Sequence, residues 1–192
     1  MVGVRQYDED KMLDKALQVF WQRGFGGTSM PEIAEATGVM RGSLYNAYGN
    51  KEKLFAVVFE RYKQNMLEDA RAALSVPEPA AAVRAFFYFT IKSMTTGKPS
   101  RGCLITKTAV NDGADSELVR GLVRGMIDTF EDLLRKRLMQ PDAAKKLLLP
   151  PAEAARLAIT LTRGIVVMER VYKDRRRLED TADSFLKILI RA

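Results

Sequence analysis

The segment from residue 28 to residue 55 constrains the fold most, because it carries start and stop signals for two short helices in succession. Ser29 and Glu32 have the spacing of a capping box, in which each side chain binds the backbone N–H of the other residue at a helix N-terminus. Pro31 falls in the first turn, where a missing N–H costs little. Gly38 stands where a left-handed residue would end this helix. We therefore expect a short helix followed by a tight turn.

A second short helix is expected after the turn, and its two faces differ. Val39 and Leu44 supply apolar anchors on one face. The other face carries hydrogen-bonding groups and a glycine: Arg41, Gly42, Ser43, Tyr45 and Asn46. A glycine weakens a helix by about 1 kcal/mol relative to alanine, so Gly42 indicates close approach of another backbone or of DNA. The pattern is typical of a helix-turn-helix motif, although any small helical domain can contain a helix, a glycine turn and a helix.

The next helix is expected to begin at Lys51, with Asn50 as its N-cap. A lysine in a first turn goes against the preference of the helix dipole for acidic groups at that end. Lys51 therefore indicates a nearby external anion.

The order of these residues resembles the N-terminal DNA-binding domain of the TetR family of transcriptional regulators. The family pattern I-A-E-A-x-G-V occurs at residues 33–39, G-S/T-L-Y at residues 42–45 and K-E-x-L at residues 51–54. The segment ALQVFWQRGFGGTS, residues 16–29, resembles the family's first helix and its exit. Two departures are Met40, where Ser or Thr usually caps the recognition helix, and Ala47, where His or Tyr is frequent.

The resemblance implies that residues 1–53 form a helix-turn-helix DNA-binding domain. Arg41 is then expected to read a base, as a bidentate donor to guanine, while Gly42 and Ser43 approach the bases closely. The other expected DNA contacts, mainly to phosphates, are Thr28, Ser29, Tyr45, Tyr48 and Lys51. Asn46 is expected to contact either a base or the DNA backbone. Tyr48 could instead pack inward, as its usual Phe counterpart suggests.

The net charge of +7 does not by itself locate a DNA-binding surface. Residues 1–53 contain seven Lys or Arg and seven Asp or Glu, so the excess of positive charge lies in residues 54–192. Local placement matters more for phosphate contact, and Arg41, Lys51 and Lys53 lie beside the expected recognition helix. The cluster of Lys173 and residues 175–177 fits a solvated turn better than a second DNA site.

The composition makes several other classes of protein difficult to build. The chain has no histidine and one cysteine, which removes the usual zinc sites, histidine-dependent triads and any intrachain disulfide. No glycine-rich phosphate loop is present either. We therefore expect no metal, no cofactor and no enzymatic activity. No apolar run approaches the roughly 18 residues that span a membrane, and the first residues lack a signal peptide's apolar core, so a cytoplasmic protein is expected.

Residues 54–192 are expected to be helical nearly throughout, because apolar positions recur at three and four residues. The fold class is therefore all-α, with about nine helices, three of them in the DNA-binding domain. Gly, Pro, Asn and Ser mark the breaks, including residues 75–79, 97–100, 111–113 and the loop region 141–151. The expected helices are 51–74, 80–96, 101–110, 115 or 116 to 138, 151–172 and about 177–190.

The resemblance also implies that residues 54–192 bind a ligand and form a homodimer. The family dimerises through its last two helices, for which the candidates here are Ile159, Thr162, Arg163, Val166, Val167, Phe185, Ile188 and Leu189. Many of these residues fit ordinary packing within one chain equally well. A two-fold dimer would present two recognition helices to successive major grooves roughly 34 to 36 Å apart, which predicts a palindromic operator on double-stranded DNA.

The expected ligand pocket is lined by large flexible apolar groups and hydroxyls, which adapt to several ligands. The candidates are Phe86, Phe89, Thr90, Met94, Met126, Phe130, Thr162 and Met168. The same aromatic stripe at helical spacing is what an ordinary core needs. Cys103 is a further candidate, because Arg101 and Lys107 could favour its reactive thiolate and some similar regulators respond to oxidants or electrophiles through an R-G-C-L segment. A buried, inert thiol is the alternative for Cys103.

Together these features predict a dimeric repressor that is released from its operator by a small molecule or electrophile bound in the C-terminal domain. The ligand would act by tilting the helix of residues 51–74, which requires different affinities for the two conformations. Activation in place of repression stays open. A helical interaction module that has lost DNA binding is a further alternative, which Met40 and Ala47 favour, and an enzyme is the weaker rival.

Overall fold

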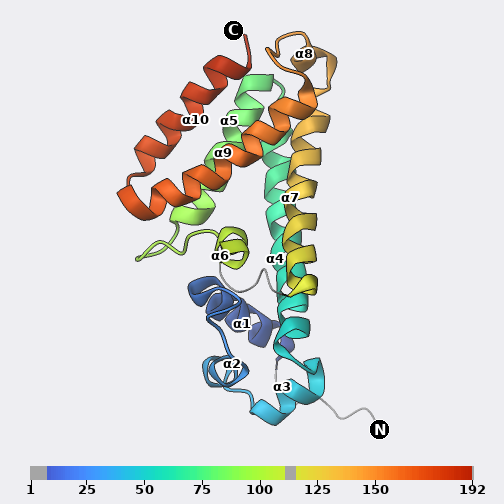
Figure 1. Ribbon diagram of the computed structural model, residues 1–192, viewed down its shortest axis with the longest axis vertical. Helices are drawn as coiled ribbons and strands as arrows, with labels where there is room; N and C mark the ends of the chain where they lie inside the picture. The colour runs from blue at the N-terminus through green and yellow to red at the C-terminus, as the bar shows by residue number, and fades with distance from the viewer. Residues whose placement is uncertain (1–7, 111–115, 192) are drawn as a thin grey trace. The chain divides into compact units, whose positions relative to one another are not determined.

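The computed structural model describes residues 8–110 and 116–191, which form ten helices (Figure 1). The predicted all-α class is confirmed, and in the described part of the chain β-type pairing is limited to one bridge between Leu147 and Ile190. No helix in these two ranges has the length and apolar character needed to cross a bilayer. The helices are α1 (Glu9–Arg23), α2 (Met30–Thr37), α3 (Arg41–Tyr48), α4 (Lys51–Leu74), α5 (Pro79–Thr95), α6 (Leu104–Val110), α7 (Glu117–Leu138), α8 (Pro141–Ala144), α9 (Pro151–Tyr172) and α10 (Arg175–Leu189).

The described residues divide into two compact units. Of the described residues, the first unit contains 8–64, 104–110 and 116–124, and the second contains 65–103 and 125–191. Helices α4 and α7 each contribute residues to both units. Helix α6 therefore belongs with the N-terminal helices, a grouping that the expected sequence boundary after residue 53 does not include.

An aromatic cluster forms the core of the first unit. The ring of Phe55 in α4 makes edge contacts with Phe20 and Phe25, at centroid distances of 5.0 and 5.1 Å. Trp21 of α1 packs edge-on against Tyr62 of α4 at 4.9 Å. These rings hold the end of α1 against α4, while α1 also packs on α2 and α2 on α3 (Figure 1).

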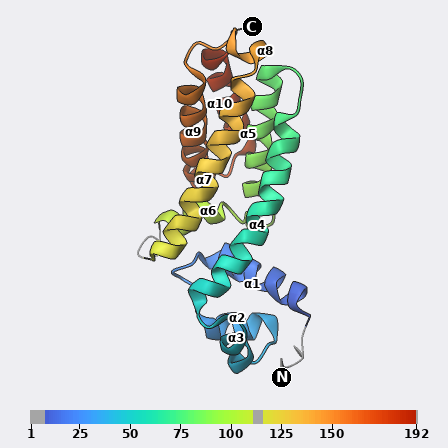
Figure 2. The ribbon, with the colours of Figure 1, turned by 90° about the vertical axis from the view of Figure 1, so that its right-hand side faces the viewer.

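The core of the second unit lies between helices that are distant in sequence. Helices α5, α9 and α10 run side by side in both views (Figures 1 and 2). Phe86 of α5 meets Phe130 of α7 at a centroid distance of 5.9 Å, and Phe87 meets Phe185 of α10 at 5.7 Å. The guanidinium of Arg84 pairs with Asp183 at 2.7 Å at the edge of this core.

Two helix starts differ from the expected positions for identifiable reasons. Helix α6 begins at Leu104 and not at residue 101, because Gly102 has a φ of 68°, which a regular helix cannot contain. Helix α10 begins earlier than expected, because the side chain of Asp174 accepts a hydrogen bond from the backbone N–H of Arg177 at 3.2 Å and acts as its N-cap.

The expectation of about nine helices agrees with the ten helices of the described residues. The additional element is α8, a single turn at Pro141–Ala144 inside the expected loop region. Ser116 precedes α7, and its hydroxyl accepts a hydrogen bond from the N–H of Val119 at 3.4 Å, which supports the Ser116 start over Asp115. The expected helix end at residues 111–113 lies outside the described residues.

Candidate nucleic-acid interface

The capping box at the start of α2 is present as the sequence predicted. The hydroxyl of Ser29 accepts from the N–H of Glu32 at 3.4 Å, and the carboxylate of Glu32 accepts from the N–H of Ser29 at 2.8 Å. The backbone and side-chain hydrogen bonds from Ser29 lower the pKa of Glu32 below its usual value. Arg23 at the end of α1 adds an ion pair to the same carboxylate. The end of α1 and the start of α2 are therefore fixed to each other.

The turn between α2 and α3 is built by Thr37 and Gly38. Gly38 adopts the left-handed conformation, with φ 73° and ψ 15°, and its N–H donates to the carbonyl of Ala34 at 3.0 Å. The hydroxyl of Thr37 donates to the carbonyl of Ile33 at 2.7 Å and accepts from the N–H of Val39 at 3.4 Å. The groups left unpaired at the end of α2 thus find partners within the turn, which sets the entry into α3.

Helix α3 has one buried face and one exposed face. Leu44 and Tyr48 are buried, and Val39 just before the helix is also buried. Ser43 is half-buried, and the exposed positions are Met40, Arg41, Gly42, Tyr45, Asn46 and Ala47. The predicted division of the helix into anchors and hydrogen-bonding groups is therefore present in the structure.

The exposed face of α3 has few partners within the protein. No described residue forms an ion pair with Arg41, whose guanidinium carbon lies 5.4 Å from the ring centroid of Tyr45. A Cβ atom built on Gly42 would meet no described atom within 4 Å, so packing within the chain does not require a glycine there. Helix α3 also lacks a side-chain N-cap, as Met40 predicted, and the side chain of Met40 is 72% exposed. From the sequence, Met40 was interpreted only as the loss of an N-cap, and nothing there indicated that its apolar side chain would be exposed.

Two of the expected phosphate contacts are buried and have hydrogen-bond partners inside the protein. The hydroxyl of Thr28 is buried and donates to the carbonyl of Gly24 at 2.7 Å. The hydroxyl of Tyr48 donates to Glu9 at 2.8 Å, which is the inward alternative for this residue. The side chains of Thr28 and Tyr48 are therefore turned away from solvent, and we leave them out of the interface proposed below.

Lys51 also has internal partners, which the sequence did not indicate. Its Nζ atom donates to the carbonyl of Phe25 at 3.0 Å and lies 4.2 Å from the centroid of the Phe25 ring. The lysine at the start of α4 is thus stabilised without an external anion. Asn50 caps this helix as predicted, since its side chain accepts from the N–H of Lys53 at 2.9 Å.

The expected ligand-binding residues of the second unit lie mostly in a packed core. Phe86, Thr90, Met94, Met126, Phe130 and Thr162 are buried, and Phe89 is half-buried. The hydroxyls of Thr90 and Thr162 donate to carbonyls of their own helices, at 2.9 and 2.6 Å. Met168 differs from the rest of the set, because it is 44% exposed.

The loop that carries Cys103 is bound to α9 by three polar residues. Cys103 is 8% exposed, and its Sγ atom accepts a hydrogen bond from Arg163 at 3.5 Å. The guanidinium of Arg170 donates to the carbonyls of Ser100 and Arg101, at 3.2 and 3.1 Å. The buried Glu169 accepts a hydrogen bond from the hydroxyl of Ser100.

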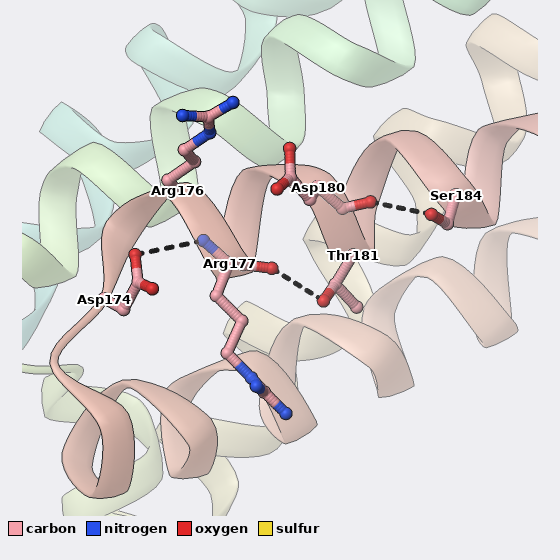
Figure 3. Close-up of a pocket in the computed structure, with 6 residues that line it drawn as sticks. All are labelled: Asp174, Arg176, Arg177, Asp180, Thr181 and Ser184. Atoms are coloured by element: carbon pink, nitrogen blue, oxygen red, sulfur yellow. Dashed lines mark hydrogen bonds between the residues drawn. The ribbon is translucent and has the colours of Figure 1, made fainter.

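A shallow hollow of about 410 Å³ lies on the surface of α10 (Figure 3). Its lining is exposed and polar, and consists of Asp174, Arg176, Arg177, Asp180, Thr181 and Ser184. None of the expected ligand-binding residues lines it. In residues 8–110 and 116–191, no group of three or more His, Cys, Asp or Glu side chains could hold a metal ion.

Helix α9 has a second apolar face that the packing of the second unit does not cover. Of the expected dimer contacts, Ile159, Thr162, Val166 and Leu189 are buried within the chain, whereas Val167 and Ile188 are exposed. Five exposed apolar or glycine residues of α9 recur at helical spacing, among other exposed residues of the helix: Leu157, Gly164, Val167, Met168 and Val171. We call these five residues the α9 stripe. They replace the buried members of the predicted set as candidates for a partner surface.

Comparison with known proteins agrees with this arrangement. Residues 12–58 match the family described as "Bacterial regulatory proteins, tetR family", and residues 79–185 match "Tetracyclin repressor-like, C-terminal domain". The HTH-type transcriptional repressor ComR of Escherichia coli (strain K12) is 30% identical over 139 residues, which cover 71% of this chain and 66% of ComR. The uncharacterized HTH-type transcriptional regulator YezE of Bacillus subtilis (strain 168) is 26% identical over 193 residues, covering 96% of this chain and 97% of YezE.

A solved structure shows the same fold over nearly the whole chain. It is a cysteine mutant of the TetR family transcriptional regulator CifR, complexed with 26bp double-strand operator DNA. It is 28% identical, covers 96% of this chain and 98% of its own, and superposes with a TM-score of 0.86. The family matches include both the helix-turn-helix segment and more than half of the chain, so the protein belongs to the tetR family of bacterial regulatory proteins.

Proposed function

We propose that this protein is a dimeric transcriptional repressor that binds a palindromic operator through α3 and is released by a small molecule or electrophile. The observation that carries the proposal is the exposed face of α3, where Arg41 has no ion-pair partner among the described residues. The turn before this helix is held in place by the hydrogen bonds of Thr37 and Gly38. Two similar proteins support it: ComR is described as a transcriptional repressor, and CifR is a transcriptional regulator whose structure was solved with operator DNA. Because the proposed ligand is genomic DNA and the family is bacterial, we propose a cytoplasmic location and no catalytic role.

Arg41 is the residue that we assign to base reading. Its guanidinium is exposed at the first turn of α3, and its planar fork matches the O6 and N7 acceptors of guanine in the major groove. Gly42 beside it has no side chain and no internal neighbour, so it allows the helix to approach the base edges. Ser43 and Asn46 supply the remaining polar groups for base or backbone contact.

Phosphate contacts are assigned to groups that remain exposed. Tyr45 is exposed on α3, and Ser29 is exposed at the start of α2, where the helix also presents backbone N–H groups. Lys53 is exposed in the first turn of α4. Lys51 stays a candidate only if DNA binding exchanges its bond to Phe25 for a phosphate, which would offset part of the gain.

The α9 stripe is the surface that we assign to the homodimer, together with Ile188 of α10. An apolar face of this length on a helix is typical of a partner interface, because water contact with it is unfavourable. Gly164 lies in the middle of the stripe, where a small residue lets two helices approach closely. Two copies related by a two-fold axis would then present two α3 helices to DNA.

The effector is assigned to the second unit, which contains the aromatic core around Phe86 and the single cysteine. Cys103 immediately precedes α6, so a group added to its sulfur would have to be accommodated at the start of that helix. The sulfur is a potential nucleophile, and the guanidinium of the neighbouring Arg163 donates a hydrogen bond to it. An electrophile is therefore one effector class that the site supports.

Selection of bound sequences from random double-stranded DNA tests the proposal. We expect an enriched palindrome whose half-sites lie on one face of the duplex, and we expect the Arg41→Ala protein to lose the preference at one base of each half-site. The absence of any enriched sequence would favour the interaction module that Met40 and Ala47 suggest. Placing the selected operator before a reporter gene then distinguishes repression from activation.

A further inference from the structure

A lysine side chain on α6 reaches the DNA-binding helices. Leu104, Ile105 and Thr108 of α6 are buried, whereas Lys107 on the same helix is half-buried and reaches the end of α1. Its Nζ atom donates to the carbonyl of Trp21 at 2.6 Å and to the carbonyl of Gln22 at 3.2 Å. The contact lies within the first unit and joins residues that are more than 80 positions apart in the sequence.

The two carbonyls that Lys107 binds belong to the last turn of α1. The last four carbonyls of a helix have no partner within the helix, and a cation at that end is stabilised by the helix dipole. The N–H of Gly24 satisfies the carbonyl of Phe20 at 2.8 Å, and Lys107 reaches the next two carbonyls. Lys107 therefore caps α1 from another helix, with a charge-assisted bond that is stronger than a neutral one.

The end of α1 is also the point from which the DNA-binding helices are positioned. Arg23 pairs with Glu32 of α2, and the hydroxyl of Thr28 binds the carbonyl of Gly24. Trp21 packs edge-on against Tyr62 of α4. A displacement of this turn of α1 would therefore move α2, and α3 with it.

We propose that Lys107 is a positioning residue for operator binding, which holds the end of α1 where α3 fits the DNA and makes the placement of α6 a determinant of operator affinity. This inference rests on the proposed function. In this proposal Lys107 itself does not contact DNA. Regulation at α6 would act by lengthening or breaking the bonds from Lys107 to the two carbonyls.

The test compares the full-length wild-type protein with the Lys107→Met variant, which keeps the aliphatic stem but loses the donor. Operator affinity is measured by fluorescence anisotropy on the sequence selected with the wild-type protein, at several salt concentrations. We expect about tenfold weaker binding, which is the scale of effect expected when a charge-assisted contact is lost. The slope of log Kd against log salt should stay unchanged, because no phosphate contact is lost. The emission of Trp21, the only tryptophan, should shift with the variant.

Two further variants separate positioning from general effects. Lys15→Met removes the same charge from an exposed site on α1 and should leave operator affinity unchanged. Lys107→Arg keeps a cation that can reach the carbonyls and should recover most of the affinity. Equal weakening by Lys15→Met, or no recovery by Lys107→Arg, would overturn the inference.

The thermal midpoint of each variant is measured alongside. A lower midpoint for Lys107→Met with unchanged operator affinity would mean that the lysine only stabilises the fold, which contradicts the proposal. Unchanged affinity together with unchanged Trp21 emission would contradict it as well. A wild-type protein that selects no operator would instead overturn the proposed function, so the two failures are distinguishable.

Discussion

The guanidinium of Arg163 donates a hydrogen bond to the sulfur of Cys103 over 3.5 Å, across the gap between α9 and the loop that precedes α6. Cys103 is only 8% exposed, which restricts access of a reagent to the sulfur. The size of an electrophile should therefore matter more at this site than its intrinsic reactivity.

Alkylation of Cys103 should weaken operator binding. We expect N-ethylmaleimide to label the wild-type protein and to raise the Kd for the operator, because the added group cannot fit beside Arg163 without displacing the loop. The Cys103→Ser protein should bind the operator normally and ignore the reagent. Full labelling by mass spectrometry with unchanged affinity would limit the effector to a non-covalent ligand.

The Arg41→Ala variant should lose roughly 1 to 3 kcal/mol of operator binding and relax the preference at one base position. The reason is the loss of a bidentate contact that only one base pair satisfies. Anisotropy titrations on the operator and on random DNA measure the difference. Arg176→Ala, which removes an exposed arginine from α10, is the matched control and should change neither. Equal weakening on both DNAs would show that Arg41 contacts only phosphate.

A charge in the α9 stripe should dissociate the dimer. Val167 is 51% exposed, and Val167→Glu would place a carboxylate in the proposed apolar interface, where its desolvation is costly. We expect a monomer in sedimentation velocity and a loss of operator affinity of about hundredfold, since each monomer then binds only one half-site. Leu118→Glu makes the same kind of change at an exposed site on α7 and should remain dimeric. A dimeric Val167→Glu protein would assign the partner surface elsewhere.

The capping box at α2 should give stability that depends on pH. Ser29→Ala should destabilise the protein by about 1 kcal/mol at neutral pH. Hydrogen bonds from Ser29 lower the pKa of Glu32 in the folded state, so the associated stability is present above the unfolded value of 4.5 and is lost as pH falls through the folded value. Urea unfolding at pH 7 and pH 3 should therefore show a smaller difference between wild type and variant at pH 3. An equal difference at both pH values would exclude Glu32 from the effect.

A side chain at Gly102 should destabilise the protein. Its φ of 68° favours glycine, and an added Cβ would clash with the guanidinium of Arg170. We expect Gly102→Ala to lower the thermal midpoint by an amount that corresponds to about 1 to 3 kcal/mol. Gly121→Ala, at a helical position with open space around it, should instead raise stability by up to about 1 kcal/mol. A neutral Gly102→Ala variant would mean that the loop moves away from α9 easily.

Local signals were enough to predict most helix ends from the sequence. Ser29 with Glu32, Gly38, Asn50 and Pro151 each act on their own backbone neighbours, so their effects need no knowledge of the rest of the fold. The start of α10 is also set locally, by the N-cap Asp174. It was not predicted, because the charged residues that follow Asp174 resemble a solvated turn.

Side-chain direction could not be predicted, because it depends on elements that are distant in the sequence. Thr28 and Tyr48 have polar groups suited to phosphate, yet Gly24 and Glu9 satisfy them inside the protein. Helix α9 has apolar residues on two faces, and only the packing of α5 and α10 shows which face remains exposed. In the sequence, Lys107 was considered only as a neighbour of Cys103. Its contact with α1 depends on the fold.

Arg170 holds the loop before α6 through the carbonyl oxygens of Ser100 and Arg101, groups that every amino acid possesses. Substitutions at those two positions during evolution would leave both carbonyl acceptors in place. Gly102, the next residue in the loop, is restricted to glycine by its positive φ and by the nearby guanidinium of Arg170. The surroundings of the cysteine could therefore diversify toward different chemical signals while the path of the backbone is inherited unchanged.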